Sequence, residues 1–235
     1  MKVLLLAAGR GTRISRYLGG NPKCTVDLTN NEKLIQYTLR NFNELGVTDI
    51  ALSLGYNPQP IKNALKDFNV KYFYNPFYDV TNSIASCWFA KEFLSDYEDT
   101  WIMNADVFME QDMFKRMLDC PKSPVMFADS RRGEEGDFKF KYNNGYLEKY
   151  GKELTGSDIS GEYIGVAKFS KDFMPYFVNQ MEEMINHQEH SVWWENILYH
   201  NLANVPVQVE EINDLFWAEV DYIEDYNRIL EFCKE

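Results

Sequence analysis

Long apolar runs are missing from this sequence of 235 residues. No stretch approaches the ~20 apolar residues that a membrane-spanning helix requires, so we expect no membrane partner. The apolar segment at residues 1–9 is too short for a secretory leader with its cleavage site, and Arg10 and Arg13 follow it directly. These absences predict a soluble, cytoplasmic protein.

Cysteine pairs and zinc-type spacings are missing as well. Cys24, Cys87, Cys120 and Cys233 lie far apart, and no two of them form a CxxC motif. Because disulfides are rare in the cytosol, we expect four reduced, scattered thiols. The sequence therefore offers neither a cysteine-based metal site nor a disulfide framework.

Positive charge is scarce. The 24 Lys and Arg residues face 36 Asp and Glu residues, and the formal net charge is −12. A nucleic-acid surface needs a basic footprint for the phosphate backbone, so nucleic acid is not an expected partner. A small anionic substrate is compatible with this charge only if its site is locally basic or holds a metal.

The first two-thirds of the chain alternates strand and helix patterns. Residues 2–7 are apolar on both faces, which is typical of a strand in the middle of a parallel sheet. Further strands are expected at 48–55, 70–74 and 100–105, and helices at 33–45, 60–68 and 83–94. This alternation predicts an α/β fold with a Rossmann-like, doubly wound, mostly parallel sheet.

The pattern changes after about residue 123, where strands crowd together. Strands are expected at 123–129, 136–142, 145–150, 161–169 and 205–210, and helices at 171–186, 191–202 and 223–233. We therefore predict antiparallel additions to the parallel sheet, and helices over one rim. Ligands of open α/β sheets bind at the carboxyl ends of strands, near the switch in strand order. The loop after residue 8, Asp106 and Asp221 fall at such ends.

A glycine-rich loop follows the first strand. The segment Leu6-Ala7-Ala8-Gly9-Arg10-Gly11-Thr12-Arg13 is followed by Pro22-Lys23. Glycines let backbone N–H groups approach phosphate oxygens, and Arg and Lys supply charge to a polyphosphate. The pattern is neither the GxGxxG dinucleotide motif, since residue 14 is Ile, nor a P-loop, since no GK[ST] follows. On loop chemistry alone, a phosphate-binding loop and a tight turn with solvated basic residues are both open.

This segment resembles the signature of the nucleoside-triphosphate-dependent nucleotidylyltransferases. These enzymes join an NMP unit to a sugar phosphate or a small phospho-alcohol and release pyrophosphate. The resemblance implies that Arg13 and Lys23 are catalytic and stabilise the transferring phosphate. It also implies that the loop supplies the nucleotide-binding residues Leu6, Ala7, Ala8, Gly9, Gly11 and Thr12.

Two acidic segments follow expected strands later in the chain. Asp106 comes after an apolar strand, at a place where Asp is often only a turn or cap residue. The segment Trp217–Asp225 resembles the family's late E-[IV]-D-x-x-x-D segment. Mg²⁺ takes one or two protein carboxylates beside substrate phosphates. The resemblance implies that Asp106 and Asp221 hold Mg²⁺.

The acceptor has a weaker signal. Tyr78–Trp88 replaces the Gly-Thr-Ala type segment of sugar-phosphate members and looks like the T-N-x-x-x-S segment of bacterial phosphocholine cytidylyltransferases and their aminoethylphosphonate relatives. That likeness implies CTP, with Asn82 and Ser86 as candidate base contacts. A quaternary ammonium binds aromatic faces at ~0.5–2 kcal/mol per good contact, and any ammonium favours a carboxylate. The predicted acceptor-binding residues are Tyr78, Trp88, Glu162, Trp194 and Glu219. Tyr163, Trp193 and Glu195 belong to the wider set of aromatic and acidic residues from which these five are chosen.

We therefore predict a single nucleotidylyltransferase domain over residues 1–235, with a nucleotide-binding half at 1–122 and an acceptor-binding half at 123–235. The predicted reaction is Mg²⁺-dependent transfer of CMP from CTP to a small phosphorylated amino-alcohol, phosphocholine, giving CDP-choline and pyrophosphate. Phosphoethanolamine, 2-aminoethylphosphonate and a sugar 1-phosphate are alternative acceptors. A non-catalytic nucleotide sensor is a further alternative, although the presence of all four predicted catalytic and metal residues argues against it.

Overall fold

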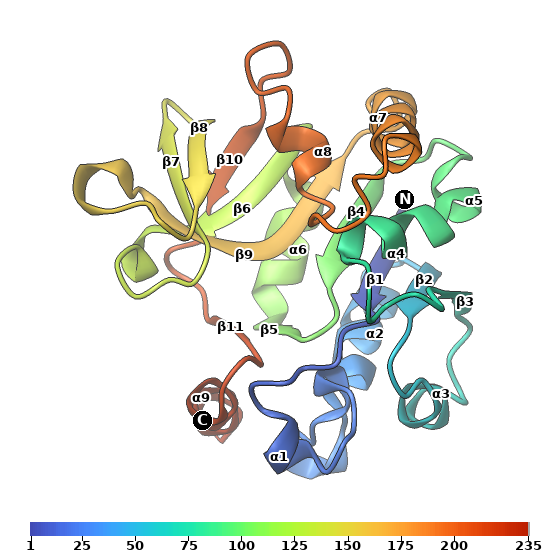
Figure 1. Ribbon diagram of the computed structural model, residues 1–235. Helices are drawn as coiled ribbons and strands as arrows, with labels where there is room; N and C mark the ends of the chain where they lie inside the picture. Colours follow the sequence, from blue (N-terminus) through green and yellow to red (C-terminus); the bar gives the residue numbers. More distant parts are fainter. Residues whose placement is uncertain (235) are drawn as a thin grey trace.

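Four parallel strands form one end of the central sheet in the computed structural model, which describes residues 1–234. Their order is β3 (Lys71–Tyr74), β2 (Asp49–Leu54), β1 (Lys2–Ala7) and β4 (Thr100–Asn104) (Figure 1). β1 is buried along its whole length, as its apolar sequence predicts. The chain thus runs from β1 outwards to β2 and β3, and then returns to the other side of β1 as β4.

The sheet continues into the second half of the chain and has nine strands. β9 (Gly161–Phe169) runs antiparallel to both β4 and β6 (Val125–Asp129). The remaining strands follow in the order β10 (Gln208–Glu211), β8 (Tyr146–Gly151) and β7 (Lys139–Asn143). The predicted α/β sheet with antiparallel additions is confirmed, and the additions continue the same sheet.

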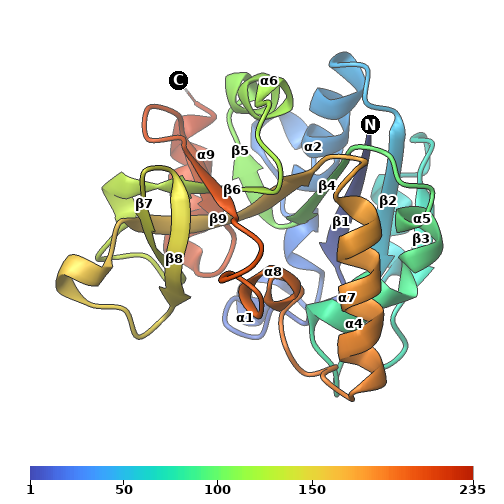
Figure 2. The ribbon, with the colours of Figure 1, turned by 90° about the horizontal axis from the view of Figure 1, so that it is seen from above.

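Helices cover both faces of the sheet, as a doubly wound fold requires (Figure 2). One face packs against α2 (Leu34–Glu44), α3 (Gln59–Ala64) and α6 (Gln111–Asp119). The other packs against α4 (Ser83–Phe89), α5 (Lys91–Leu94), α7 (Met174–Asn186) and α8 (Asn196–Tyr199). Three expected helices are clearly shorter than predicted: the one at 60–68 ends at Ala64, the one at 83–94 divides into α4 and α5, and only α8 forms within 191–202.

A two-stranded ribbon outside the main sheet was not predicted. β5 (Val107–Met109) pairs antiparallel with β11 (Trp217–Glu219). A third apolar cluster joins this ribbon to α9 (Ile223–Phe232) and to the segment around α1 (Ser15–Leu18). Strands of three residues are too short to show a period in the sequence, which explains the omission. The helix α6 was also missed.

The remaining regular elements are short 3-10 helices at Lys23–Thr25, Thr29–Asn31, Ser130–Arg132 and Gly156–Asp158. Within residues 1–234, no helix combines the length and the apolar character needed to cross a membrane.

Candidate active site

A cavity opens where the strand order switches, at the carboxyl ends of β1 and β4. β1 pairs with β2 on one edge and with β4 on the other. Because the chain leaves these strands in opposite directions, the loops part and leave space for a ligand. The cavity has a volume of about 340 Å³, and both halves of the chain line it.

The glycine-rich loop after β1 borders this cavity. A Cβ added to Gly9 would meet no atom within 4 Å, so the backbone there is open to an incoming ligand. Gly11 has a φ of +59°, and a Cβ there would lie 2.7 Å from Cγ of Lys23. Glycine at position 11 therefore allows both the left-handed turn and the close passage of the Lys23 side chain.

Three carboxylates converge beside the loop. Oxygens of Asp106, Glu219 and Asp221 lie within 4.8 Å of one another. The β5–β11 ribbon brings them together, because Glu219 pairs with Val107 and the Val220 N–H donates to the Asp106 carbonyl at 3.0 Å. A short element that the sequence did not reveal thus positions the acidic cluster.

Two cations contact the acidic cluster. Nζ of Lys23 lies 3.0 Å from Oδ2 of Asp106 and also pairs with Asp221, while Nη1 of Arg13 lies 2.5 Å from Oδ2 of Asp221. Burial opposes the ionisation of Asp221, but Lys23 and Arg13 outweigh it and lower the pKa of the carboxyl. Burial likewise opposes the charge of Lys23, and Asp106 and Asp221 outweigh it and raise the pKa. The four predicted catalytic and metal residues therefore lie together and pair with one another.

The cluster suits a divalent cation. Burial raises the pKa of Glu219 well above its usual range, and the repulsion from Asp106 and Asp221 adds to the shift. Nδ2 of Asn104 donates to Glu219 at 3.3 Å and orients it. Mg²⁺ prefers hard oxygen ligands and needs only one or two carboxylates beside substrate phosphates. Three carboxyl groups close together form an all-oxygen donor set that meets those requirements.

A polar wall, defined as Asn75, Thr81, Asn82 and Ser86, lines one side of the cavity. Nδ2 of Asn75 donates to Thr81 Oγ1 at 3.0 Å and to Ser86 Oγ at 3.1 Å. Asn82 caps α4, where its Oδ1 accepts from the Ser83 N–H at 2.8 Å. These bonds hold small hydrogen-bonding groups in fixed positions, as the recognition of a planar base requires.

An aromatic end, defined as Phe138, Tyr163, Trp193 and Glu195, closes the cavity on another side. The ring of Phe138 meets that of Trp193 edge to face, with centroids 5.4 Å apart. Burial raises the pKa of the Glu195 carboxyl to about 8. Glu195 has no ion-pair partner among residues 1–234. A buried carboxylate beside aromatic rings favours a ligand that brings its own positive charge.

Most of the predicted site residues lie around one space. The cavity lining includes Leu6, Ala8, Gly9, Arg13, Lys23, Tyr78, Asn82, Ser86, Asp106, Glu162, Glu219 and Asp221. Ala7 and Gly11 border a smaller adjoining pocket of about 70 Å³, and Thr12 lines neither. Both Glu162 oxygens are already bound, one to Arg132 Nε at 2.7 Å and one to the Asp137 N–H at 2.8 Å. Glu162 therefore braces the cavity wall.

Two predicted acceptor residues lie away from the cavity lining. Trp194 is fully buried between Phe169 and Phe177 in the core. Trp88 is partly buried on α4, with the Lys91 ammonium 5.0 Å from its ring centroid. Trp193 lines the cavity in place of its neighbour Trp194, which the sequence analysis had chosen, because the backbone turns Trp193 outwards and Trp194 into the apolar layer.

The sequence analysis missed Asn75, Asp137, Phe138 and Lys152, which all line the cavity. Nζ of Lys152 lies 2.8 Å from Oδ2 of Asp137, and the same oxygen lies 3.5 Å from Nη1 of Arg13. Lys152 also lies over Trp193, 5.7 Å from the ring centroid. These residues come from loops and strand ends without a motif, so only their meeting in the fold identifies them.

Comparison with known proteins gives a consistent result. Residues 3–194 match the family described as the MobA-like NTP transferase domain. The CTP:phosphoglutamine cytidylyltransferase of Campylobacter jejuni is 26% identical over 96% of this chain and 97% of its own length. The choline-phosphate cytidylyltransferase of Streptococcus pneumoniae is 25% identical over 100% and 99%. A solved structure of the CTP:phosphocholine cytidylyltransferase from Streptococcus pneumoniae superposes with a TM-score of 0.82, covers 98% of each chain and is 22% identical, so it supports the fold.

Proposed function

Because the chain belongs to the family of MobA-like NTP transferase domains, we propose that this nucleotidyltransferase transfers CMP from CTP to phosphocholine, giving CDP-choline and pyrophosphate. Two relatives that match over nearly their whole length are named as cytidylyltransferases, which supports CTP. The acceptors in their names differ, phosphoglutamine in one and choline phosphate in the other. The acceptor therefore has to be argued from the cavity.

The aromatic end is the observation that carries the choice of acceptor. We propose that a quaternary ammonium contacts its rings, and each good contact contributes ~0.5–2 kcal/mol. Glu195 supplies a carboxylate whose burial is costly until a cation arrives, since its exposed fraction is only 8%. A sugar phosphate would instead require several polar partners for its hydroxyls. A small cationic phospho-alcohol therefore fits this end better than a sugar 1-phosphate does.

The polar wall supports a pyrimidine base beside the glycine-rich loop. Cytosine presents an amino donor and a ring acceptor on one edge. We propose that Asn82 and Ser86, together with the loop backbone, bind that edge. Both side chains face the cavity, and the contacts of Ser86 with Asn75 and of Asn82 with α4 fix their positions.

The proposed chemistry needs no nucleophile from the protein. A phosphate oxygen of the acceptor attacks the α-phosphorus of CTP in line, the bond to the β-phosphate oxygen breaks, and pyrophosphate leaves. Catalysis then consists of positioning the two phosphates and balancing their charge. Arg13 and Lys23 contact the acidic cluster and border the cavity, so they can turn to the phosphates and stabilise the charge that develops there.

Mg²⁺ would be held by Asp106 and Asp221, with Glu219 beside them. When bound, the ion neutralises phosphate charge and makes the α-phosphorus a better electrophile. The carboxylates that would hold the ion adjoin Arg13 and Lys23. This arrangement explains how a protein with a net charge of −12 can bind two anionic substrates.

We further propose that residues 1–122 form the nucleotide half and residues 123–235 the acceptor half. The first half supplies the glycine-rich loop and the polar wall, whereas the aromatic end comes from the second. The metal residues Asp106 and Asp221 come from both. The cytoplasm is the proposed location, on the argument from the sequence.

The test is pyrophosphate release with Mg²⁺, with the four NTPs crossed against phosphocholine, phosphoethanolamine, 2-aminoethylphosphonate and glucose 1-phosphate. We expect release with CTP and phosphocholine, which stops in EDTA and returns with added Mg²⁺. Release with glucose 1-phosphate and UTP or dTTP would assign the chain to the sugar branch. Binding of CTP without release from any pair would indicate either an acceptor outside this set or a nucleotide sensor.

A matched pair of tryptophan variants tests the aromatic end separately. Trp193→Ala removes a ring from the cavity wall, and Trp88→Ala removes a partly buried ring outside the lining. We expect Trp193→Ala to raise KM for phosphocholine about 10-fold, which corresponds to ~1.4 kcal/mol, while KM for CTP changes little. Equal effects of the two variants on KM for phosphocholine would contradict the aromatic end as the acceptor site.

A further inference from the structure

The strand β11, which leads into Glu219 and Asp221, has little strand pairing of its own. β11 pairs with β5 alone, over three residues, and neither strand belongs to the nine-stranded sheet. Glu219 ends this strand and Asp221 follows it. Something outside the ribbon must therefore set the position of β11 against the main sheet, where the rest of the cavity is built.

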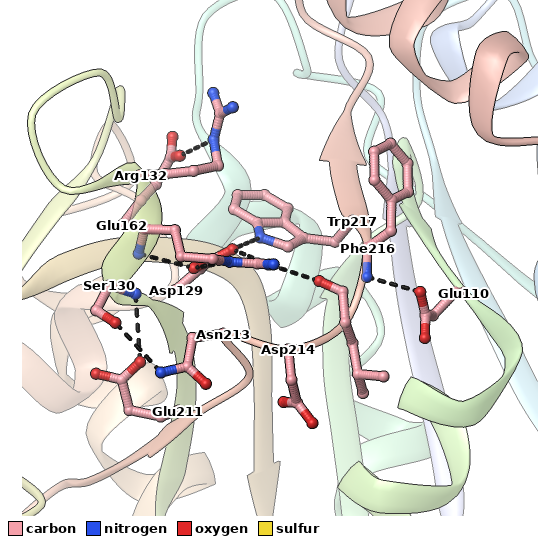
Figure 3. A network of polar contacts seen from close by, with 12 residues as sticks. Glu110, Asp129, Ser130, Arg132, Glu162, Glu211, Asn213, Asp214, Phe216 and Trp217 are labelled. Atoms are coloured by element: carbon pink, nitrogen blue, oxygen red, sulfur yellow. Dashed lines mark hydrogen bonds and ion pairs between the residues drawn. The ribbon is translucent and has the colours of Figure 1, made fainter.

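Asp129 makes that connection. It ends β6 in the main sheet, is 1% exposed, and accepts a hydrogen bond from Nε1 of Trp217 at 2.9 Å. Figure 3 shows the Trp217 indole directed at Asp129 within a larger polar network. Arg131 donates to both Asp129 oxygens, at 3.0 and 2.7 Å, and its Nη2 also donates to the Leu215 carbonyl at 2.6 Å. One buried carboxylate thus holds β11 at Trp217 directly and the chain before it through Arg131.

The face of the Trp217 ring is held as well. The guanidinium carbon of Arg132 lies 5.9 Å from the ring centroid, and Arg132 Nε donates to Glu162 at 2.7 Å. Glu162 pairs directly with Asp129 across β9 and β6. The indole is therefore fixed at its N–H and on its face by two neighbouring carboxylates of the main sheet, one of them acting through Arg132.

Trp217 transmits this constraint to the metal residues. Trp217 and Glu219 are two residues apart on an extended strand, so their side chains share one face. A rotation or shift of Trp217 would move Glu219 and Asp221 with it. We propose that Asp129 is a positioning residue that acts through the Trp217 indole to hold Glu219 and Asp221 in place for the metal. This inference rests on the proposed Mg²⁺-dependent reaction.

The charge state of Asp129 agrees with this role. Burial opposes ionisation of Asp129, but its hydrogen bonds from Arg131 and Trp217 outweigh burial and lower the pKa of the carboxyl. An ionised acceptor makes the bond to the indole N–H a charge-assisted one, which is stronger than a neutral bond. The lowered pKa thus favours the ionised acceptor that this hydrogen bond uses.

The chain offers a matched control for the tryptophan. Trp101 is also fully buried, and its Nε1 has no hydrogen-bond partner within residues 1–234. Trp217→Phe and Trp101→Phe remove the same atoms from two buried sites. Only the first substitution removes a hydrogen bond to the main sheet. Asp129→Asn gives a second, independent variant that keeps the shape of the side chain and removes its charge.

The measurement is CTP binding by calorimetry, in the absence of acceptor, with saturating Mg²⁺ and with EDTA. The ratio of the two Kd values reports what the metal contributes. We expect this ratio to be about 10-fold smaller in Trp217→Phe and in Asp129→Asn than in the unsubstituted protein. Such a change is the low end of the effect of outer-sphere partners at metal sites. Their Kd in EDTA should stay within about twofold of the unsubstituted protein, and Trp101→Phe should keep the full ratio. Melting temperatures confirm that each variant is folded.

The other possible outcomes would contradict either the positioning role of Asp129 or the proposed metal site. If Trp217→Phe keeps the full ratio, or Trp101→Phe loses as much, Asp129 has no positioning role. The same holds if the Kd in EDTA rises as much as the Kd in Mg²⁺, because the defect would then lie outside the metal site. If the unsubstituted protein shows no gain from Mg²⁺, the proposed metal site fails and takes this inference with it.

Discussion

The two ends of the cavity are assembled in different ways. The nucleotide end, where the glycine-rich loop lies, takes that loop and both of its cations from one continuous segment, residues 6–23, which begins at the end of β1 and runs to Lys23. The aromatic end draws on three separate places, at Phe138, Tyr163 and Trp193–Glu195. A continuous segment leaves a motif in the sequence, whereas a wall built from separate loops leaves none.

Charge also differs between the two ends. At the nucleotide end, Lys23 and Arg13 already pair with Asp106 and Asp221. At the aromatic end, Glu195 has no ion-pair partner among the described residues. Substitutions at the first end should therefore affect turnover with every acceptor, and substitutions at the second should affect one class of acceptor.

The largest effect is expected from Asp106→Asn and from Lys23→Ala. Each removes a charge from the cluster at the switch point, where the transferring phosphate needs balanced charge. We expect kcat to fall about 1,000-fold, or ~4 kcal/mol, with phosphocholine and with any alternative acceptor. Asp67→Asn, at an exposed position, is the control. A loss confined to one acceptor would remove the distinction between the ends.

A smaller loss is expected from Gly11→Ala. The new Cβ would lie 2.7 Å from Cγ of Lys23 and must displace that side chain. Gly19→Ala is the matched control, because Gly19 has a similar φ of +57° but no atom within 4 Å of the added Cβ. Both should lose ~1–2 kcal/mol of stability from the left-handed backbone. Only Gly11→Ala should lower kcat, by about 100-fold, as expected when a catalytic group is misplaced. Equal kcat values in the two variants would show that Lys23 tolerates the displacement.

The smallest effect is expected at the aromatic end, and it depends on pH. Burial raises the pKa of Glu195 to about 8, so in the free enzyme the carboxyl is mostly protonated below that pH. A cationic acceptor binds the ionised form, so kcat/KM for phosphocholine should rise as the pH rises through about 8. The quaternary ammonium does not titrate, and the phosphate is already dianionic above about pH 7.

Glu195→Gln should remove this rise and increase KM for phosphocholine about 10-fold at high pH, with little change in KM for CTP. Profiles of kcat/KM from pH 7 to about 9 for the two proteins provide the measurement. A rise that persists in Glu195→Gln would assign the titration to another group.

Two adjacent tryptophans, Trp193 and Trp194, show what could not be predicted from the sequence. The apolar strands, the loop after β1 and the acidic positions Asp106 and Asp221 follow from local patterns, and part of the loop and both acids line the cavity. Trp193 and Trp194 could not be separated in the same way. Both are large and aromatic, and which one faces the cavity depends on how the chain before α8 meets α4, where the Trp194 N–H donates to Ser83 Oγ at 3.0 Å.

The sequence by itself determined the class of fold and the glycine-rich loop, because these depend on neighbouring residues and on simple periods. The resemblance of that loop to a known signature implied the family of chemistry. The tertiary structure decided which carboxylates meet and what lines the acceptor end. Asp106 and Asp221 come together through a ribbon of three-residue strands, and Asp129 fixes that ribbon through Trp217. Contacts between residues so distant in the chain arise only when the sheet has formed, since no local pattern records which segments a fold will bring together.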